Sequence, residues 1–194
     1  MTRVAKITRT TKETDITLEL QLDVEKGGFI GTTGVGFFDH MLNSFGVHGG
    51  FLLKGEVKGD LHIDCHHTVE DTGIVIGQLF GEVLGDKGGI MRFGESHVPM
   101  DEALAFAAVD ISGRAFLVFD VPMTAPMIGA YDTQMNEEFF RAMAFNAGMT
   151  LHVRTDYGDN DHHKIEAAFK AVARAVSAAV KPRDGGVLSA KGVL

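Results

Sequence analysis

The chain has 194 residues, of which 45% are hydrophobic and 23% are charged, a balance typical of a folded globular protein. Acidic residues outnumber basic residues by 26 to 18, so the formal net charge is −8 and no basic run offers a surface for nucleic acid. The first residues lack the apolar core of a signal peptide, no apolar run is long enough to cross a membrane, and a single cysteine, Cys65, excludes an intramolecular disulfide. We therefore expect a cytoplasmic protein that binds neither nucleic acid nor membrane.

Hydrophobic periodicity predicts mixed secondary structure in the first half of the chain. Alternating apolar and polar residues are typical of strands with one buried face, and apolar residues three or four apart are typical of helices. A polar connection between the first two strands indicates a hairpin, and Gly49 and Gly50 are expected to end the first helix. The predicted order is a strand at 3–9, a strand at 15–23, a helix at 37–49, a strand at 51–64 and a helix at 66–85.

The second half of the chain has a similar pattern. Its first segment, residues 101–121, predicts two strands that form a hairpin with its turn at Ser112 and Gly113. The last predicted helix must end before Pro182, because proline cannot continue it. The remaining predicted elements are a helix at 132–148, a strand at 150–158 and a helix at 161–180.

A His-His-x-x-Glu motif occurs once in each half and indicates an internal duplication. The two copies begin at His66 and His162, 96 residues apart, which is close to half of the 194-residue chain. We therefore expect one functional domain made of two halves, residues 1–90 and 91–194, which meet in the glycine-rich residues 86–96.

The spacing within this motif predicts metal binding. Residues four apart lie on the same face of a helix, so the first histidine and the glutamate of each motif can approach one ion. Adjacent helical residues point about 100° apart, so the second histidine is aimed at a different ion. We predict two metal centres, within one subunit or between subunits, formed by His66, Glu70 and His163 and by His162, Glu166 and His67.

Two further residues are candidates to complete the coordination shells. His40 lies on a predicted helix 26 residues before the first motif, and Glu138 lies at the corresponding place 24 residues before the second. Imidazole and carboxylate ligands without thiolate suit manganese, iron, cobalt, nickel or zinc. A single His-His pair on a surface helix usually binds no metal, but two duplicated copies with a glutamate at the same offset favour metal binding.

The two motifs and their surroundings resemble the imidazoleglycerol-phosphate dehydratase family of histidine biosynthesis. The matching segments follow one another in order and cover nearly the whole chain, so the resemblance is far more specific than a lone motif. These segments are TKETDI, FFDHML, HIDCHHTVEDTGI, MDEALA, DISGR, GMTLHV, DHHKIEAAFKA and SAKGVL.

This resemblance implies an α+β fold of two similar halves, each a small β-sheet with helices packed on one face. It also implies a homo-oligomer, a 24-mer built from trimers, with about two Mn²⁺ ions per subunit in sites shared between subunits. The implied reaction is the dehydration of imidazole glycerol phosphate, a small phosphate substrate, to imidazole acetol phosphate.

The family pattern also implies roles for individual residues. The implied metal ligands are His40, His66, His67, Glu70, Glu138, His162, His163 and Glu166, although relatives more often have histidine at position 138. Phosphate contacts are implied for Arg92, Arg114, Ser189 and Lys191, since arginine and lysine bind phosphate oxygens. The other implied substrate contacts are Glu13, His40, His48, His66, His67 and Glu70, and the implied acid–base carboxylates are Glu13, Glu70 and Glu166.

The implied reaction needs an electron sink, because it removes a carbon-bound hydrogen that no neighbouring carbonyl acidifies. Metal at both nitrogens of the imidazole ring would stabilise the deprotonated ring, which is a chemical reason for two centres. We expect a base, with Glu13 as the first candidate, to remove the hydrogen, and hydroxide to leave through a diazafulvene-like intermediate.

Two other functions fit part of the pattern. A metal-dependent hydrolase would use similar ligands, although the chain lacks the His-Glu-x-x-His motif of many metalloproteases. A non-catalytic metal-binding shell would need no basic carboxyl-terminal segment to hold phosphate. Three remaining histidines, His62, His97 and His152, have no expected role.

Overall fold

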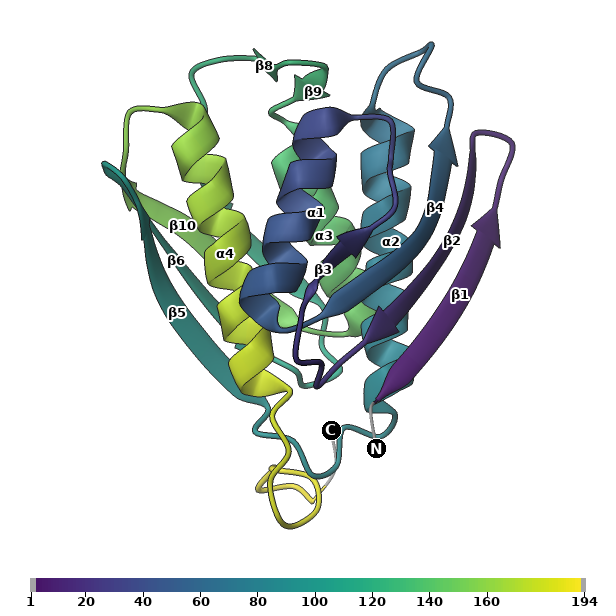
Figure 1. The fold of residues 1–194 in the computed structure, drawn as a ribbon. Coiled ribbons are helices and arrows are strands. Elements are labelled where there is room, and N and C mark those ends of the chain that lie inside the picture. Colours follow the sequence, from purple (N-terminus) through teal and green to yellow (C-terminus); the bar gives the residue numbers. More distant parts are fainter. Residues whose placement is uncertain (1–2, 193–194) are drawn as a thin grey trace.

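The computed structural model describes residues 3–192, in which four helices lie between two four-stranded sheets. Each sheet covers the helix layer with one face and leaves its other face outside (Figure 1). This arrangement follows from the sequence pattern, because each strand alternates buried and exposed residues and can bury only one face. The expected α+β fold of two similar halves, each a sheet with helices on one face, is confirmed.

The first sheet contains two of the predicted strands as a hairpin. Alternating residues of the second strand, among them Leu18 and Leu20, are fully buried against the helices. The predicted strand at 51–64 ends earlier, at Gly59, so His62 lies beyond it. A further strand of three residues was not predicted, since so short a segment has no measurable periodicity. The strand order is β1 (Val4–Thr10), β2 (Thr14–Gln21), β4 (Leu52–Gly59) and β3 (Gly28–Ile30).

The second sheet has the same order as the first but corrects one prediction. Its strands are β5 (Phe93–Met100), β6 (Ala103–Asp110), β10 (Thr150–Tyr157) and β7 (Phe116–Asp120). The predicted hairpin at Ser112 and Gly113 is wrong, because β6 pairs with β5 and β10, and β7 runs parallel to β10. The hairpin turn lies instead at Asp101 and Glu102. Strand β5 was not predicted, because only Val98 in it is buried.

All four predicted helices are present. Two of them end at glycines in the left-handed conformation, Gly50 at φ 68° and Gly148 at φ 65°, where a side chain would be strained. Between β7 and α3 lies a small ribbon of β8 (Met127–Ile128) and β9 (Tyr131–Asp132), which has no counterpart in the first half of the described chain. The helices are α1 (Gly36–Gly49), α2 (His66–Leu84), α3 (Met135–Ala147) and α4 (Asp161–Ala179).

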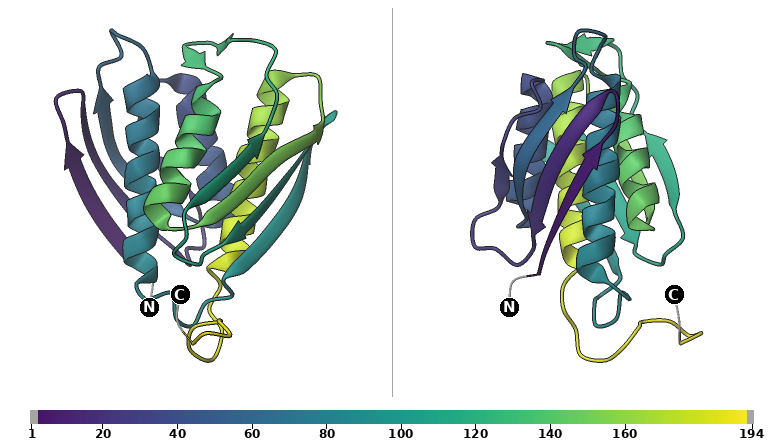
Figure 2. Two further views of the ribbon diagram at one scale, coloured as in Figure 1. Left: turned by 180° about the vertical axis from the view of Figure 1, so that it is seen from behind. Right: turned by 90° about the vertical axis from the view of Figure 1, so that its right-hand side faces the viewer.

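Helix contacts join the two halves into one core. Helix α2 of the first half packs against α3 of the second, and α1 packs against α4 (Figure 2). The first sheet is formed entirely before residues 85–92 and the second entirely after them. No helix within residues 3–192 is long and apolar enough to span a membrane.

Glycines in α2 permit its close approach to α3. A Cβ atom added at Gly77 would lie 2.5 Å from the carbonyl oxygen of Met143, closer than packed atoms can approach. We expect Gly77→Ala to lower the free energy of unfolding by about 1–3 kcal/mol through overpacking. Gly81→Ala is the matched control, because its Cβ would lie 3.5 Å from the nearest atom and should stabilise the helix by up to about 1 kcal/mol. Thermal unfolding at one protein concentration measures both, and equal midpoints would contradict the packing argument.

Candidate metal centre

Both His-His-x-x-Glu motifs lie in the first two turns of a helix. Helices α2 and α4 begin at the same end of the helix layer (Figure 1). The side chain of Asn160 accepts hydrogen bonds from the N–H groups of His162 and His163 at 2.9 and 3.4 Å. Asp64 similarly accepts a hydrogen bond from the N–H of His66 at 2.7 Å. These short polar side chains satisfy N–H groups that have no partner within the helix, so the motif starts at a defined place.

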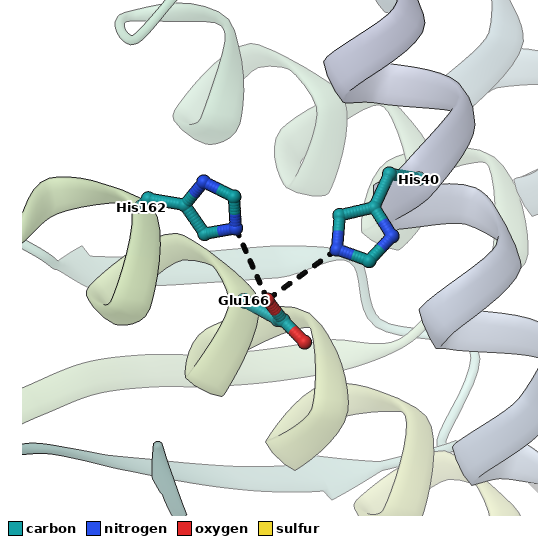
Figure 3. A group of neighbouring side chains, drawn as sticks. All are labelled: His40, His162 and Glu166. Carbon is teal, nitrogen blue, oxygen red and sulfur yellow. Dashed lines mark hydrogen bonds and ion pairs between the residues drawn. The ribbon is translucent and has the colours of Figure 1, made fainter. Parts of the chain in front are cut away.

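The second motif forms a three-ligand cluster together with His40. Glu166 Oε2 lies 3.2 Å from His162 Nε2 and 3.4 Å from His40 Nε2 (Figure 3). One ligand atom from each residue lies within 4.8 Å of the others, close enough to surround one ion. His40 comes from α1 and the other two residues from α4, so the packing of these helices creates the cluster. The sequence alone indicated His40 as a ligand but not which motif it joins.

Glu166 is held in an electrostatic environment that keeps it charged. Its side chain is only 9% exposed, and its other oxygen, Oε1, forms an ion pair with Lys170 Nζ at 2.7 Å. Burial alone would raise the pKa of Glu166, but the Lys170 ammonium and the nearby His40 outweigh it, so the pKa lies below its usual value. A charged carboxylate aimed at two imidazole nitrogens is a suitable ligand for a transition metal.

The first motif is more open. His66 Nε2 lies 3.3 Å from Glu70 Oε2, as the four-residue spacing predicts, but the Glu70 side chain is 40% exposed. Glu138, the predicted additional ligand, instead pairs with Arg141, whose Nε lies 3.6 Å from Glu138 Oε2. Within residues 3–192 this motif forms no three-ligand cluster.

The second histidine of each motif is supported by a carboxylate on its Nδ1 atom. Asp60 Oδ2 lies 2.9 Å from His67 Nδ1, and Glu102 Oε2 lies 2.7 Å from His163 Nδ1. These carboxylates raise the pKa of both histidines. A carboxylate on one ring nitrogen is the usual support for a histidine that binds metal through the other nitrogen.

The described chain does not assemble the crossed ligand sets that the motif spacing predicts. His163 lies beside Asp101 and Glu102, not beside the first motif. The cluster at the second motif takes its third member from His40 and not from His67. The crossed sets therefore stay a prediction, and they would require ligands from neighbouring subunits.

Glu13 lies beside the first motif. It occupies the turn between β1 and β2, where its Oε2 is 3.8 Å from His67 Nε2. The Thr11 hydroxyl accepts hydrogen bonds from the N–H groups of Glu13 and Thr14 at 3.1 and 3.0 Å, which fixes the turn. Asp71 of α2 binds the Thr14 hydroxyl and ties this turn to the helix that carries His67. The structure thus brings an exposed carboxylate to a candidate metal ligand.

The predicted phosphate-binding residues gather elsewhere in the fold. Arg92 donates two hydrogen bonds to Asp110 at 2.7 and 3.0 Å and a third to the carbonyl of Leu188 at 2.6 Å. Arg114 lies 3.8 Å from the same carboxylate and is 72% exposed. In the carboxyl-terminal segment the Ser189 hydroxyl accepts a hydrogen bond from the N–H of Lys191 at 3.2 Å. The two arginines and the terminal segment therefore form one basic site.

This basic site and the metal cluster lie at opposite ends of α4. The backbone N–H of Arg92 donates to the carbonyl of Ala179, the last residue of α4, at 2.8 Å. A helix rises about 1.5 Å per residue, so His162 and Ala179 are separated by about 26 Å along its axis. One small substrate cannot reach both ends of the same chain.

His48 lies near the end of α1, beside the carboxyl-terminal end of α4 and therefore at the end that carries the basic site. It lines an open pocket of about 260 Å³ together with Arg174 of α4 and Lys181. Burial, followed by the charges of Lys170 and Arg174, lowers the pKa of His48, which favours its neutral form. The position allows a contact with a ligand in the pocket but does not join His48 to the metal cluster.

Comparison with known proteins decides the family. The family model described as imidazoleglycerol-phosphate dehydratase matches residues 33–176, which is more than half of the chain. The chain belongs to the imidazoleglycerol-phosphate dehydratase family. The enzyme of Lacticaseibacillus casei is 55% identical over 194 residues, covering 99% of this chain and 100% of the relative. The enzyme of Acidiphilium cryptum is 56% identical over 197 residues and is covered completely, as is this chain.

Solved structures of imidazoleglycerol-phosphate dehydratases share the fold. The crystal structure from Staphylococcus aureus is 40% identical with a TM-score of 0.79, covering 92% of this chain and 99% of that one. The structure from Pyrococcus furiosus in complex with (S)-C348 is 35% identical with a TM-score of 0.82, covering 97% of this chain and 100% of that one. The family resemblance drawn from the sequence motifs is confirmed, and the chain is a hydro-lyase rather than a hydrolase or a metal store.

Three residues that contact the candidate ligands were missed by sequence reasoning. Lys170 lies four residues after Glu166, so the spacing of one helical turn could have indicated it. Asp60 lies in the connection after β4, seven residues before His67, and Glu102 lies in the connection after β5, 61 residues before His163. No helical or strand periodicity links either carboxylate to its histidine, so neither contact could be predicted from the spacing alone.

Proposed function

We propose that this enzyme dehydrates imidazole glycerol phosphate to imidazole acetol phosphate with manganese held by the two His-His-x-x-Glu motifs. The observation that carries the proposal is the convergence of His40, His162 and Glu166 on one point. Formation of the keto product before and after removal of bound metal tests it. The metal's identity and a cytoplasmic location stay predictions.

The residues present fit a transition metal. Imidazole and carboxylate donors without thiolate match manganese and its neighbours in the series, and the carboxylates behind His67 and His163 provide the usual outer support. Bound metal would supply a Lewis acid that favours the deprotonated imidazole ring of the substrate. By the family pattern, the ligands of the two centres are His40, His66, His67, Glu70, Glu138, His162, His163 and Glu166.

Glu13 is the best-placed group to move a proton. It lies within 3.8 Å of His67 in a turn fixed by two hydrogen bonds to the Thr11 hydroxyl, and its exposed side chain is open to a substrate. Glu70 and Glu166 are less suitable as the base, because each lies closer to a histidine of its own motif, at 3.3 and 3.2 Å, and is proposed to bind metal together with it. We therefore assign removal of the carbon-bound hydrogen to Glu13.

The length of α4 supports an active site shared between subunits. Arg92 and Arg114 lie at the carboxyl-terminal end of this helix, whereas His162 and Glu166 lie at its beginning. If both groups contact one substrate, the phosphate contacts and the metal ligands must come from different chains. This requirement agrees with the 24-mer built from trimers that the resemblance implies.

Mixed assemblies test the shared site. We expect Arg114→Ala and His162→Ala each to lose most turnover, and co-expressed mixtures of the two to regain it in about a quarter of the sites by random pairing. Arg114 is exposed and makes only a 3.8 Å ion pair, so its loss should not disturb the fold. A mixture of Arg114→Ala and Lys191→Ala is the control and should regain nothing, because both changes lie in the same basic site. Turnover of the first mixture no greater than that of its separate components would contradict the shared site.

A further inference from the structure

The duplication predicts two equivalent metal centres, but their partners differ. His40 lies ten residues before Gly50 and Glu138 lies ten residues before Gly148, the two left-handed glycines that end α1 and α3. The two residues therefore occupy equivalent places in the two halves. Nevertheless, His40 faces Glu166, whereas Glu138 pairs with Arg141.

The carboxylates of the two motifs also differ in how firmly they are held. Glu166 has Lys170 on one oxygen and two histidines on the other, and its side chain is 9% exposed. Glu70 is 40% exposed, and the residue one turn after it, equivalent to Lys170, is Ile74, which offers no charge. Glu70 must therefore be ordered when an ion binds, whereas Glu166 is already in place.

We propose that the two centres bind metal in order, the centre at His40, His162 and Glu166 first and the centre at His66 and Glu70 second. The inference depends on one part of the proposed function, namely that both motifs bind metal. Ligands that are already positioned lose little conformational freedom on binding, which strengthens binding. Lys170 binds Oε1 of Glu166, so Oε2, the oxygen that faces the histidines, stays available to bind an ion. The centre at His66 and Glu70 needs a further ligand. Either Glu138 must first break its ion pair with Arg141, or a neighbouring subunit must supply the ligand.

Titration of the full-length, chelator-stripped protein with Mn²⁺ alone tests this order. Free Mn²⁺ is followed by electron paramagnetic resonance, and we expect two classes of about one ion per chain with dissociation constants at least about tenfold apart. His40→Ala should remove the tighter class and leave the weaker one. Glu138→His should tighten the weaker class, because it restores the ligand type present at the equivalent place. His152→Ala, an exposed strand residue away from both motifs, is the control and should change neither class.

The outcomes separate this inference from the proposed function. Two ions in a single class would overturn the ordered binding, as would loss of the tighter class in His66→Ala but not in His40→Ala. Formation of the keto product is measured on the same samples. Ordered binding without product would leave the inference standing and reject the proposed function, whereas a single class with normal product would reject only the inference.

Discussion

Removal of bound metal with a chelator is expected to lower formation of imidazole acetol phosphate by about 1,000-fold or more. A Lewis acid at the substrate's ring contributes several kcal/mol to the stability of the transition state, and each 1.36 kcal/mol corresponds to about tenfold in rate. The described cluster offers no alternative electron sink, since the imidazole and carboxylate groups of His40, His162 and Glu166 do not accept electrons. Addition of Mn²⁺ should restore the rate.

The metal content of the same samples distinguishes between the possible explanations of a change in rate. About two ions per chain together with restored product would support the paired centres. Mg²⁺ is the control ion, because it prefers oxygen ligands and should restore little activity at sites rich in imidazole. Two bound Mn²⁺ ions with no keto product would reject the metal-dependent dehydration. Full turnover by metal-free protein would remove metal from the mechanism.

Replacement of Glu13 by glutamine is expected to lower kcat by about 100- to 10,000-fold, the usual contribution of a positioned acid or base. Glutamine keeps the size and most contacts of the side chain but cannot accept a proton. The turn around it is held by Thr11 and Thr14 through the backbone, so the fold should not change. Metal content, counted in the same samples, should therefore stay at the wild-type value.

Glu25→Gln is the matched control for this variant. Glu25 is also an exposed carboxylate in a connection between strands, but it lies in the segment after β2 rather than beside His67. Its replacement should leave kcat unchanged. Near-normal turnover of Glu13→Gln would exclude Glu13 from the reaction. Loss of both metal and turnover would mean that Glu13 supports the proposed ligand His67 instead of moving a proton.

Local patterns in the sequence determined most of the secondary structure and the internal repeat. The helices at α2 and α4 were predicted because their apolar residues recur at helical spacing, and Val69, Ile76 and Phe169 are indeed buried. The same spacing predicted that His66 meets Glu70 and that His162 meets Glu166, since residues four apart on one helix must be neighbours. These contacts depend on only a few consecutive residues.

The tertiary structure alone decided how distant segments meet. Strand β6 pairs with β5 rather than with β7, because β10 lies between β6 and β7 in the sheet. His40 joins the second motif because α1 packs on α4, and no periodicity within α1 contains that information. The separation of Arg92 from His162 likewise follows from the length of α4 and from which of its ends each residue approaches. A contact between residues far apart in sequence depends on the packing of the whole chain, and a local pattern cannot specify it.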